Sequence, residues 1–208
     1  MRLVLATANP DKAQELLAIL QHQLGGHVEL VPRPVGVTAV EETGETLEDN
    51  ARLKAVALSA ATGEAAVADD TGLEVDALRG EPGPRAARYA GEAATYLDNV
   101  AKLLAALEGE SNRRARFRTV VVCRFPDGTE IIGEGVVEGE ILPSPRGEGG
   151  FGYDPVFAPR GGGGRSFAEM GPDEKHQLSH RGLALRSFAA QLKQDEALAA
   201  RERHAGRS

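Results

Sequence analysis

The 208-residue sequence predicts an α/β fold in which helices cover a mixed β-sheet. Apolar runs typical of buried strands alternate with segments whose apolar residues recur at helical spacing. Two long strand-like segments, 115–125 and 129–142, flank the turn sequence Pro126-Asp127-Gly128 and predict an antiparallel hairpin, which makes the sheet mixed. No segment has the composition of a linker. We therefore expect one domain over residues 1–208, in which two lobes would have to share one continuous sheet.

The chain begins with a predicted strand that runs directly into a helix. Residues 3–6 form an unbroken apolar run, and the apolar residues of 13–20 share one helical face. Asn9 is predicted to be the N-cap and Pro10 the first helical residue. Free backbone N–H groups at a helix start attract an anion, and Lys12 adds positive charge in the first turn. The segment is either a phosphate-binding loop or an ordinary strand–helix junction, and no glycine-rich phosphate motif decides between the two.

The middle and the end of the chain continue the alternation of strands and helices. Residues 27–31 predict a short strand, and a proline pair interrupts it before a second extended segment at 35–40. Thr46 and Asp49 form a capping pair for a helix that Gly63 ends. The later predicted elements are a strand at 65–68 that delivers Asp69 and Asp70 into a loop, an ordered loop at 80–91, a helix capped by Thr95, the hairpin, a glycine-rich segment at 143–152, a short strand at 156–157, a helix at 183–193 and a frayed tail from about 195 to 208.

Composition limits the possible partners. A formal charge of -7 argues against nucleic acid and anionic membranes. The single cysteine, Cys123, lies in an apolar run and is predicted to be a buried, inert thiol. No apolar stretch approaches the roughly 20 residues needed to span a bilayer, and the N-terminus lacks the layout of a signal peptide. The sequence therefore favours a cytoplasmic enzyme that acts on a small molecule.

Two acidic pairs could serve a metal-bound phosphate. Asp69-Asp70 follow a predicted buried strand, at the edge where open α/β sheets bind ligands. Adjacent residues of an extended chain point to opposite sides, so one carboxylate would face the site and the other would anchor the loop. Glu41-Glu42 lie in a second loop. A magnesium ion on a polyphosphate needs only one or two protein carboxylates, but a polar turn and a solvated loop would explain the same residues.

Two later segments could bind a planar, polar ligand. Residues 149–154 join Phe151 and Tyr153 to a backbone with little bulk, which could lay an aromatic ring on a base; the alternative is a flexible linker anchored by its aromatic residues. A group of hydrogen-bond donors precedes the final helix, where it suits a keto oxygen or a phosphate, or else caps the helix and faces solvent. These donors are Lys175, His176, Ser179, His180 and Arg181.

Taken in order along nearly the whole chain, these segments resemble the Ham1/RdgB family of inosine triphosphate pyrophosphatases, also called XTP/dITP diphosphatases. The resemblance implies a homodimeric, magnesium-dependent enzyme that hydrolyses ITP, dITP and XTP to the nucleoside monophosphate and pyrophosphate, and so clears deaminated purines from the nucleotide pool. It also implies an elongated mixed sheet flanked by helices, with two lobes and a central substrate cleft. The segments that carry it are Thr7-Ala8-Asn9-Pro10-Asp11-Lys12, Glu41-Glu42-Thr43-Gly44, Ala68-Asp69-Asp70-Thr71-Gly72-Leu73, Pro82-Gly83, Ala87-Arg88-Tyr89-Ala90-Gly91, Gly149-Gly150-Phe151-Gly152-Tyr153-Asp154-Pro155 and Ser179-His180-Arg181-Gly182.

The resemblance also implies roles for residues at matching positions. Glu42 and Asp70 would hold Mg²⁺, and Asp70 would be the general base. Thr71 would contact the substrate. The other implied substrate-binding residues are Thr7, Ala8, Asn9, Pro10, Asp11 and Lys12 at the triphosphate, and Phe151, Gly152, Tyr153, Asp154, Lys175, His180 and Arg181 at the base. Asp11 would be unfavourable beside a phosphate unless its carboxylate points away.

The implied selectivity has a simple physical basis. Hypoxanthine and xanthine carry a keto oxygen at C6 where adenine carries an amino group, so donors from His180 or Arg181 would favour the former. Guanine carries the same keto oxygen, and the sequence does not show how GTP is excluded. Two rival functions remain open: a pyrophosphatase for modified pyrimidine nucleotides, as in the Maf family, and a nucleotide-binding module without catalysis, which would not need Glu42 and Asp70 at a metal.

Overall fold

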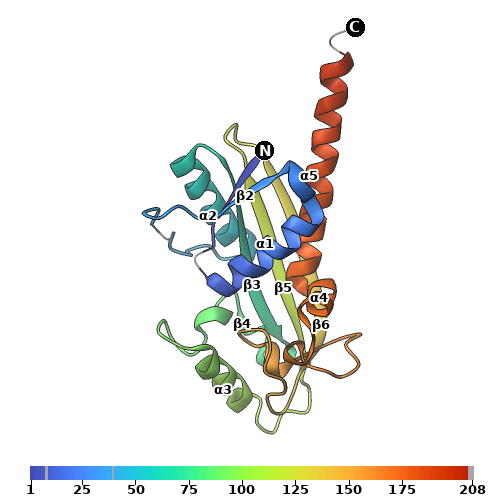
Figure 1. Ribbon diagram of the computed structural model, residues 1–208. Helices are drawn as coiled ribbons and strands as arrows, with labels where there is room; N and C mark the ends of the chain where they lie inside the picture. Colours follow the sequence, from blue (N-terminus) through green and yellow to red (C-terminus); the bar gives the residue numbers. More distant parts are fainter. Residues whose placement is uncertain (8, 39, 206–208) are drawn as a thin grey trace.

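The structure is a computed structural model that describes residues 1–7, 9–38 and 40–205 (Figure 1). Its centre is a seven-stranded sheet with the strand order β2-β1-β3-β5-β6-β7, in which β4 pairs with β3. β1 lies parallel to β2 and β3, whereas β3, β5, β6 and β7 are antiparallel neighbours, so the predicted mixed sheet is confirmed. The strands are β1 (Arg2–Leu5), β2 (Glu29–Val31), β3 (Ala65–Val75), β4 (Pro82–Gly83), β5 (Arg114–Arg124), β6 (Glu130–Ile141) and β7 (Phe157–Pro159).

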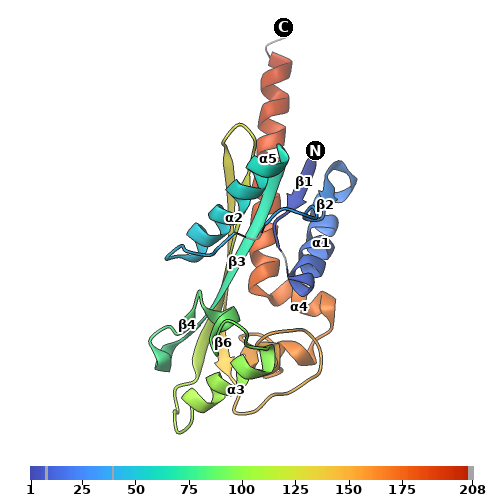
Figure 2. The same cartoon turned by 90° about the vertical axis from the view of Figure 1, so that its left-hand side faces the viewer.

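The helices divide the elongated molecule into an upper and a lower lobe (Figures 1 and 2). In the upper lobe, α1 and α5 cover one face of the sheet and α2 covers the other; in the lower lobe, α3 and the segment 143–171 pack around the far ends of β3, β5 and β6. The α-helices are α1 (Pro10–Leu24), α2 (Leu47–Thr62), α3 (Tyr96–Ala106), α4 (Pro172–Leu178) and α5 (His180–Ala205), and single 3₁₀ turns lie at Gly25–His27, Asp76–Leu78, Ala86–Arg88, Asp154–Val156 and Phe167–Glu169. Within the described part of the chain, no helix combines the length and apolar character needed to cross a bilayer.

The alternation of side chains along the strands builds these layers. In β3, Val67 packs into the cluster under α1 and α5, whereas its neighbours Ala66 and Ala68 pack into the cluster under α2. A third cluster fills the lower lobe around Phe157 and Phe167. Because β3, β5 and β6 pass from one lobe into the other, the two lobes share one hydrogen-bonded ladder.

Helix α5 approaches β6 closely because two facing strand residues lack a side chain. A Cβ atom at Gly135 would lie 2.5 Å from the backbone nitrogen of Ala184 and 2.8 Å from the Cβ of Leu183, and it would also meet the carbonyl of His180. At Gly133 a Cβ would meet the same helix one turn further on. The glycines thus fix the distance between the sheet and the first turns of α5.

Most predicted helix boundaries are confirmed. Asn9 is the N-cap of α1 and Pro10 its first residue. Thr46 caps α2 and Gly63 ends it in a left-handed conformation, with φ of 68°. Thr95 caps α3 through a reciprocal pair with Asp98. The antiparallel hairpin of β5 and β6 is also confirmed, and Cys123 is a buried free thiol whose pKa burial raises to about 12.

Other predictions are wrong. β3 continues to Val75, so Asp69 and Asp70 lie within a strand and not in a loop, because pairing with β5 carries the strand past the end of β1. Val35 and Gly36 form a turn, and no strand forms over the described residues of 35–40. The sequence did not predict α4, and α5 spans His180–Ala205 instead of 183–193. The predicted fraying of the last residues is not tested.

Candidate functional site

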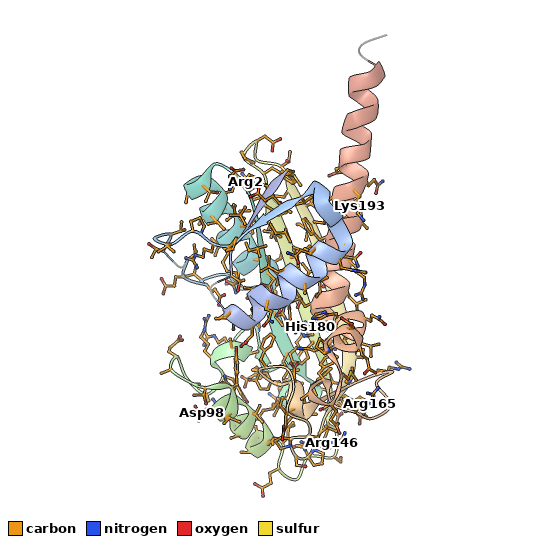
Figure 3. All side chains as sticks on the ribbon, viewed as in Figure 1. Arg2, Asp98, Arg146, Arg165, His180 and Lys193 are labelled. Carbon is orange, nitrogen blue, oxygen red and sulfur yellow. The ribbon has the colours of Figure 1, made fainter. Side chains whose placement is uncertain are left out.

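Two adjoining cavities lie between the lobes, at the start of α1. The first, of about 240 Å³, is lined by Thr7, Lys12, Glu42 and Asp69 among others. The second, of about 80 Å³, is lined by residues of both lobes, including Phe151 and the buried His180, which Figure 3 labels between the upper and the lower lobe. Asn9 and Lys12 line both cavities, so a ligand that fills both must pass these two residues. We name the first the anion cavity and the second the aromatic cavity.

The start of α1 is stabilised by its own side chains. Asn9 Oδ1 accepts from the backbone N–H groups of Asp11 at 2.9 Å and Lys12 at 3.2 Å, and the Thr7 hydroxyl accepts from the N–H of Asn9. These amides are therefore not free for an anion, contrary to the expectation from the sequence. The charge of Lys12, whose side chain is 19% exposed, is the feature of this helix start that suits a phosphate. Pro10 and Asp11 line neither cavity, and Ala8 lies outside the described residues.

Glu42 and Asp70 meet at a shared cation. The ammonium of Lys54, on α2, lies 2.9 Å from Glu42 Oε1 and 3.1 Å from Asp70 Oδ1. Burial would lower the pKa of Lys54, but Asp70, Asp69 and Glu42 outweigh it and raise the pKa. Arg88, from the lower lobe, binds the second oxygen of Glu42 at 3.1 Å and so fixes the orientation of that carboxylate.

The two neighbouring aspartates have different environments. Asp69 lies toward α5, 3.2 Å from Arg181 Nε and 3.8 Å from Lys12 Nζ. Burial alone would raise its pKa, but Lys12, Arg181 and Lys54 hold the pKa of this carboxyl well below its usual range. Asp70 lies toward α2, and burial together with Glu42 raises its pKa despite Lys54 and Lys12. The opposite orientations follow from the strand alternation that the sequence predicted.

This donor set fits a hard divalent cation. The oxygens of Glu42 and Asp70 already converge on one cation, and Asp69 Oδ1 is buried without a hydrogen-bond partner in the described residues. Within those residues, no cluster of three or more His, Cys, Asp or Glu side chains could hold a metal alone. A metal here would therefore need oxygens from the ligand or water to complete its shell, as magnesium usually does.

The aromatic cavity is built on a buried ionic network. Lys175 Nζ lies 2.6 Å from both Asp154 Oδ2 and Glu15 Oε1, and Arg181 Nη1 lies 2.6 Å from Glu15 Oε2. Lys175 Nζ also lies 4.8 Å from the ring centroid of Phe151. The network holds the ring and both cations in fixed positions, so the cavity presents an aromatic face beside buried charges.

A hydrogen bond to a hydroxyl group, and not an ion pair, holds the imidazole of His180. Its Nδ1 lies 2.7 Å from the hydroxyl of Thr119, which lies 2.7 Å from the hydroxyl of Thr71. Arg181 Nη2 donates to Thr71 at 3.2 Å, and the imidazole stacks on Phe117. Burial and the cations of Arg181 and Lys175 keep the pKa of His180 well below 6.5, so the ring is neutral.

Tyr96 joins the lobes across the mouth of the aromatic cavity. Its hydroxyl accepts from Asn9 Nδ2 at 2.9 Å and donates to Asp11 Oδ2 at 3.0 Å. Its ring lies 5.9 Å from that of Phe151. The carboxylate of Asp11 thus faces Tyr96, away from the anion cavity.

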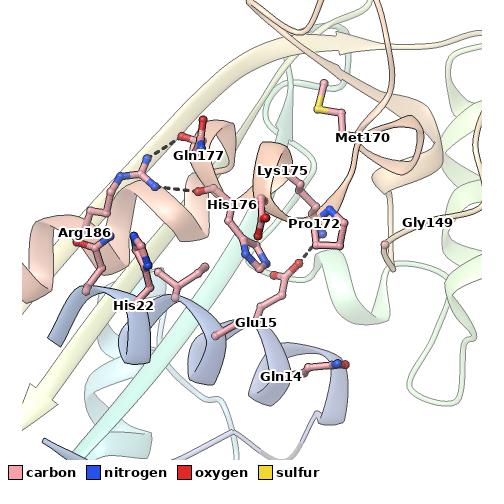
Figure 4. A pocket seen from close by; sticks show the side chains of 15 residues that line it. Gln14, Glu15, His22, Gly149, Met170, Pro172, Lys175, His176, Gln177 and Arg186 are labelled. Carbon is pink, nitrogen blue, oxygen red and sulfur yellow. Dashed lines mark hydrogen bonds and ion pairs between the residues drawn. The ribbon is translucent and has the colours of Figure 1, made fainter. Parts of the chain in front are cut away.

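A larger open groove of about 1040 Å³ lies behind the site, between α1 and α4 (Figure 4). Arg186 crosses it and donates to the carbonyls of His176 and Gln177 at the end of α4. Glu15 and Lys175 line the groove with their ion pair, which separates it from the aromatic cavity. Lys175 and His176 line this groove, which shares only Lys175 with the aromatic cavity and no lining residue with the anion cavity.

The structure brings most of the predicted residues together. Thr71, Phe151, Gly152, Tyr153, Asp154, Lys175, His180 and Arg181 line the aromatic cavity, and Thr7, Asn9, Lys12 and Glu42 line the anion cavity. Asp70 lines neither cavity but contacts Lys54, which lines the anion cavity. Sequence reasoning missed Glu15, Lys54, Tyr96 and Thr119. Asn50 donates to Asp70 Oδ2 at 3.4 Å and lies four residues before Lys54 on α2, and this spacing of two polar residues is the signal that could have pointed to Lys54.

Comparisons with known proteins agree with this geometry. The model of the Ham1 family matches residues 3–191. The dITP/XTP pyrophosphatase of Desulforamulus reducens is 48% identical over 189 residues, covering 89% of this chain and 92% of that protein. A dITP/XTP pyrophosphatase of Thermus thermophilus is 49% identical over 191 residues and 90% of each chain. A Ham1 protein structure from Coxiella burnetii superposes with a TM-score of 0.84 at 38% identity, over 93% of this chain and 99% of that chain. With this fold and these relatives, the chain belongs to the Ham1 family.

Proposed function

We propose that this protein hydrolyses deaminated purine nucleoside triphosphates, dITP, ITP and XTP, to the nucleoside monophosphate and pyrophosphate. The relatives named dITP/XTP pyrophosphatase support the activity and the substrates. The observation that carries the proposal is the pair of adjoining cavities, one with cations and carboxylates and the other with an aromatic ring and hydrogen-bond donors. A purine nucleotide has the matching polarity, with an anionic tail at one end and a planar base at the other.

The triphosphate would lie in the anion cavity. Lys12 and Lys54 would neutralise phosphate charge, and Thr7 would donate from its hydroxyl. Glu42 and Asp70 would hold Mg²⁺, which supplies charge neutralisation at the phosphates when bound. Lys54 now occupies the position between these carboxylates, so it would move toward the phosphates when the metal binds.

Asp70 would be the general base toward the attacking water. Its raised pKa brings a carboxylate closer to the pH at which it accepts a proton efficiently. Asp69, with a depressed pKa and a buried bond to Arg181, would stay ionised and hold Lys12 and Arg181 in place. Asp70→Asn is nearly isosteric and should keep the fold while reducing turnover by roughly 10²-fold or more. Near-normal turnover in this variant would move the role to Asp69.

One assay tests the proposal against its rivals. Pyrophosphate release is measured from dITP, XTP and ITP, with modified pyrimidine triphosphates alongside, in Mg²⁺ and in EDTA. We expect release from the purines, dependent on Mg²⁺. A nucleotide-binding module would release none, and a Maf-like enzyme would prefer the pyrimidines. The homodimer and the cytoplasmic location belong to the same proposal, and light scattering on the purified protein tests the dimer.

A further inference from the structure

We propose that Thr71 and Thr119 form a hydrogen-bond relay that fixes the tautomer of His180, so that its Nε2–H presents a donor to the 6-keto oxygen of the base. This inference rests on the proposed function, because it assigns the discrimination between keto and amino purines to named atoms. Thr119 is then a positioning residue, since it acts through His180.

The relay begins at a group that can only donate. The guanidinium of Arg181 has no acceptor, so its Nη2 must donate to the Thr71 hydroxyl oxygen at 3.2 Å. The Thr71 hydroxyl lies 2.7 Å from that of Thr119, and the two residues are direct partners in the β3–β5 ladder. Strand pairing therefore holds these hydroxyls at a fixed separation.

Counting hydrogens sets the direction of the relay. If Thr71 donates to Thr119 and Thr119 donates to His180 Nδ1, every hydroxyl hydrogen has an acceptor. If the direction is reversed, Thr119 donates to Thr71, and the hydrogen of Thr71 has no acceptor among the described residues. Thr71 lines the aromatic cavity, so in the reversed direction its hydrogen could be met only by water or a ligand, whereas the forward direction satisfies both hydroxyl hydrogens within the protein. The forward direction makes Nδ1 an acceptor and places the ring proton on Nε2.

The surroundings of His180 suit this role. His180 is 4% exposed and its ring is neutral, the residue lines the aromatic cavity, and stacking on Phe117 fixes the plane of the ring. The Nδ1 atom is engaged by Thr119, so Nε2 is the ring nitrogen left for a ligand. Arg181 is less able to read the base, because its Nε, Nη1 and Nη2 each already bind Asp69, Glu15 or Thr71. A fixed Nε2–H would pair with a keto oxygen and meet a second donor in adenine.

The test compares Thr119→Val, Thr119→Ser and Thr62→Val. Valine keeps the volume of threonine and removes the hydroxyl, serine keeps the hydroxyl, and Thr62 is a control on α2, where its hydroxyl binds the Leu58 carbonyl. We expect the dITP-to-dATP ratio of kcat/KM to fall about 10- to 100-fold in Thr119→Val. Without the Thr119 hydroxyl the proton of His180 is no longer held on Nε2, so the ring no longer opposes the amino group of adenine with a second donor. Thr119→Ser and Thr62→Val should keep the ratio of the wild type.

A second readout follows the tautomer itself. Nitrogen-15 NMR of the imidazoles in the wild type, with His180 assigned by its loss in His180→Gln, should show the proton on Nε2, and Thr119→Val should shift the population toward Nδ1. A proton on Nδ1 in the wild type, or an unchanged ratio in Thr119→Val, would overturn the relay. A wild type that releases no pyrophosphate from dITP would instead overturn the proposed function, and the NMR result would still decide the relay.

Discussion

A single methyl group on β6 should disturb both stability and catalysis. In Gly135→Ala the new Cβ would lie 2.5 Å from the nitrogen of Ala184, whereas ordinary contact begins at 3.4 Å. Helix α5 would thus have to retreat by about 0.9 Å at that atom, and by more at the carbonyl of His180. The three nearest neighbours are two backbone atoms and the Cβ of Leu183, none of which can rotate away.

The expected magnitudes follow from this displacement. Overpacking of this kind costs about 1–3 kcal/mol. For a chain of this length each kcal/mol lowers Tm by about 2–4 °C, so we expect a fall of roughly 2–12 °C. The first turn of α5 carries His180 and Arg181, and a displacement near 1 Å of groups that position a substrate can cost about 100-fold in kcat/KM.

Calorimetry and the kcat/KM for dITP measure the two effects. Gly26→Ala is the matched control, because a Cβ there meets nothing within 4 Å and its backbone conformation suits alanine. If the clash were absent, alanine in the strand would stabilise the protein by about 0.5–1 kcal/mol relative to glycine. An unchanged or higher Tm in Gly135→Ala would therefore refute the close approach of α5 to the sheet.

Two further predictions concern Tyr96 and Asp69. Asn9 lines both cavities, and its amide nitrogen now donates to the Tyr96 hydroxyl, so we infer that this bond competes with the substrate for Asn9. Tyr96→Phe keeps the ring and removes the hydroxyl, so KM for dITP should fall about 3- to 10-fold, with Tyr89→Phe as the control. An unchanged or higher KM would contradict this competition. The pKa of Asp69 is depressed in the folded protein, so near pH 4 this carboxylate takes up a proton in the unfolded chain but not in the folded protein. The contribution of Asp69 to the free energy of unfolding is therefore present above about pH 4 and is lost as the pH falls below that value. Urea unfolding at several pH values should show that the free energy of unfolding falls more steeply with decreasing pH in the wild type than in Asp69→Asn. Equal slopes in the two proteins would contradict this prediction.

Local signals in the sequence predicted much of the upper lobe. Asn9, Pro10, Thr46 and Gly63 mark helix ends by the chemistry of a few adjacent residues, and such signals do not depend on the rest of the fold. The end of β3 was mispredicted because its continuation depends on pairing with β5, some fifty residues later in the chain. Short-range patterns contain no information about that partner.

The same limit applies to the site. The grouping of Glu42 with Asp70 was implied by the resemblance, but Lys54 between them depends on how α2 lies over the sheet. Thr119 is one of several polar residues in β5, which also contains arginines, and its role depends on the register that sets it opposite Thr71. Glu15 lies on α1, and its ion pairs with Lys175 and Arg181 depend on how α1 packs against α4 and α5.

The continuous strands β3, β5 and β6 determine how this protein can accommodate a ligand. Among the described residues, three paired strands connect the lobes along the sheet, so widening the space between the lobes must bend these strands together. Such a ladder resists bending, so we expect a ligand to move individual side chains such as Tyr96 and Lys54 before the backbone. The protein would act as a preorganised receptor, in which recognition costs little backbone entropy and rearrangement is confined to a few rotamers.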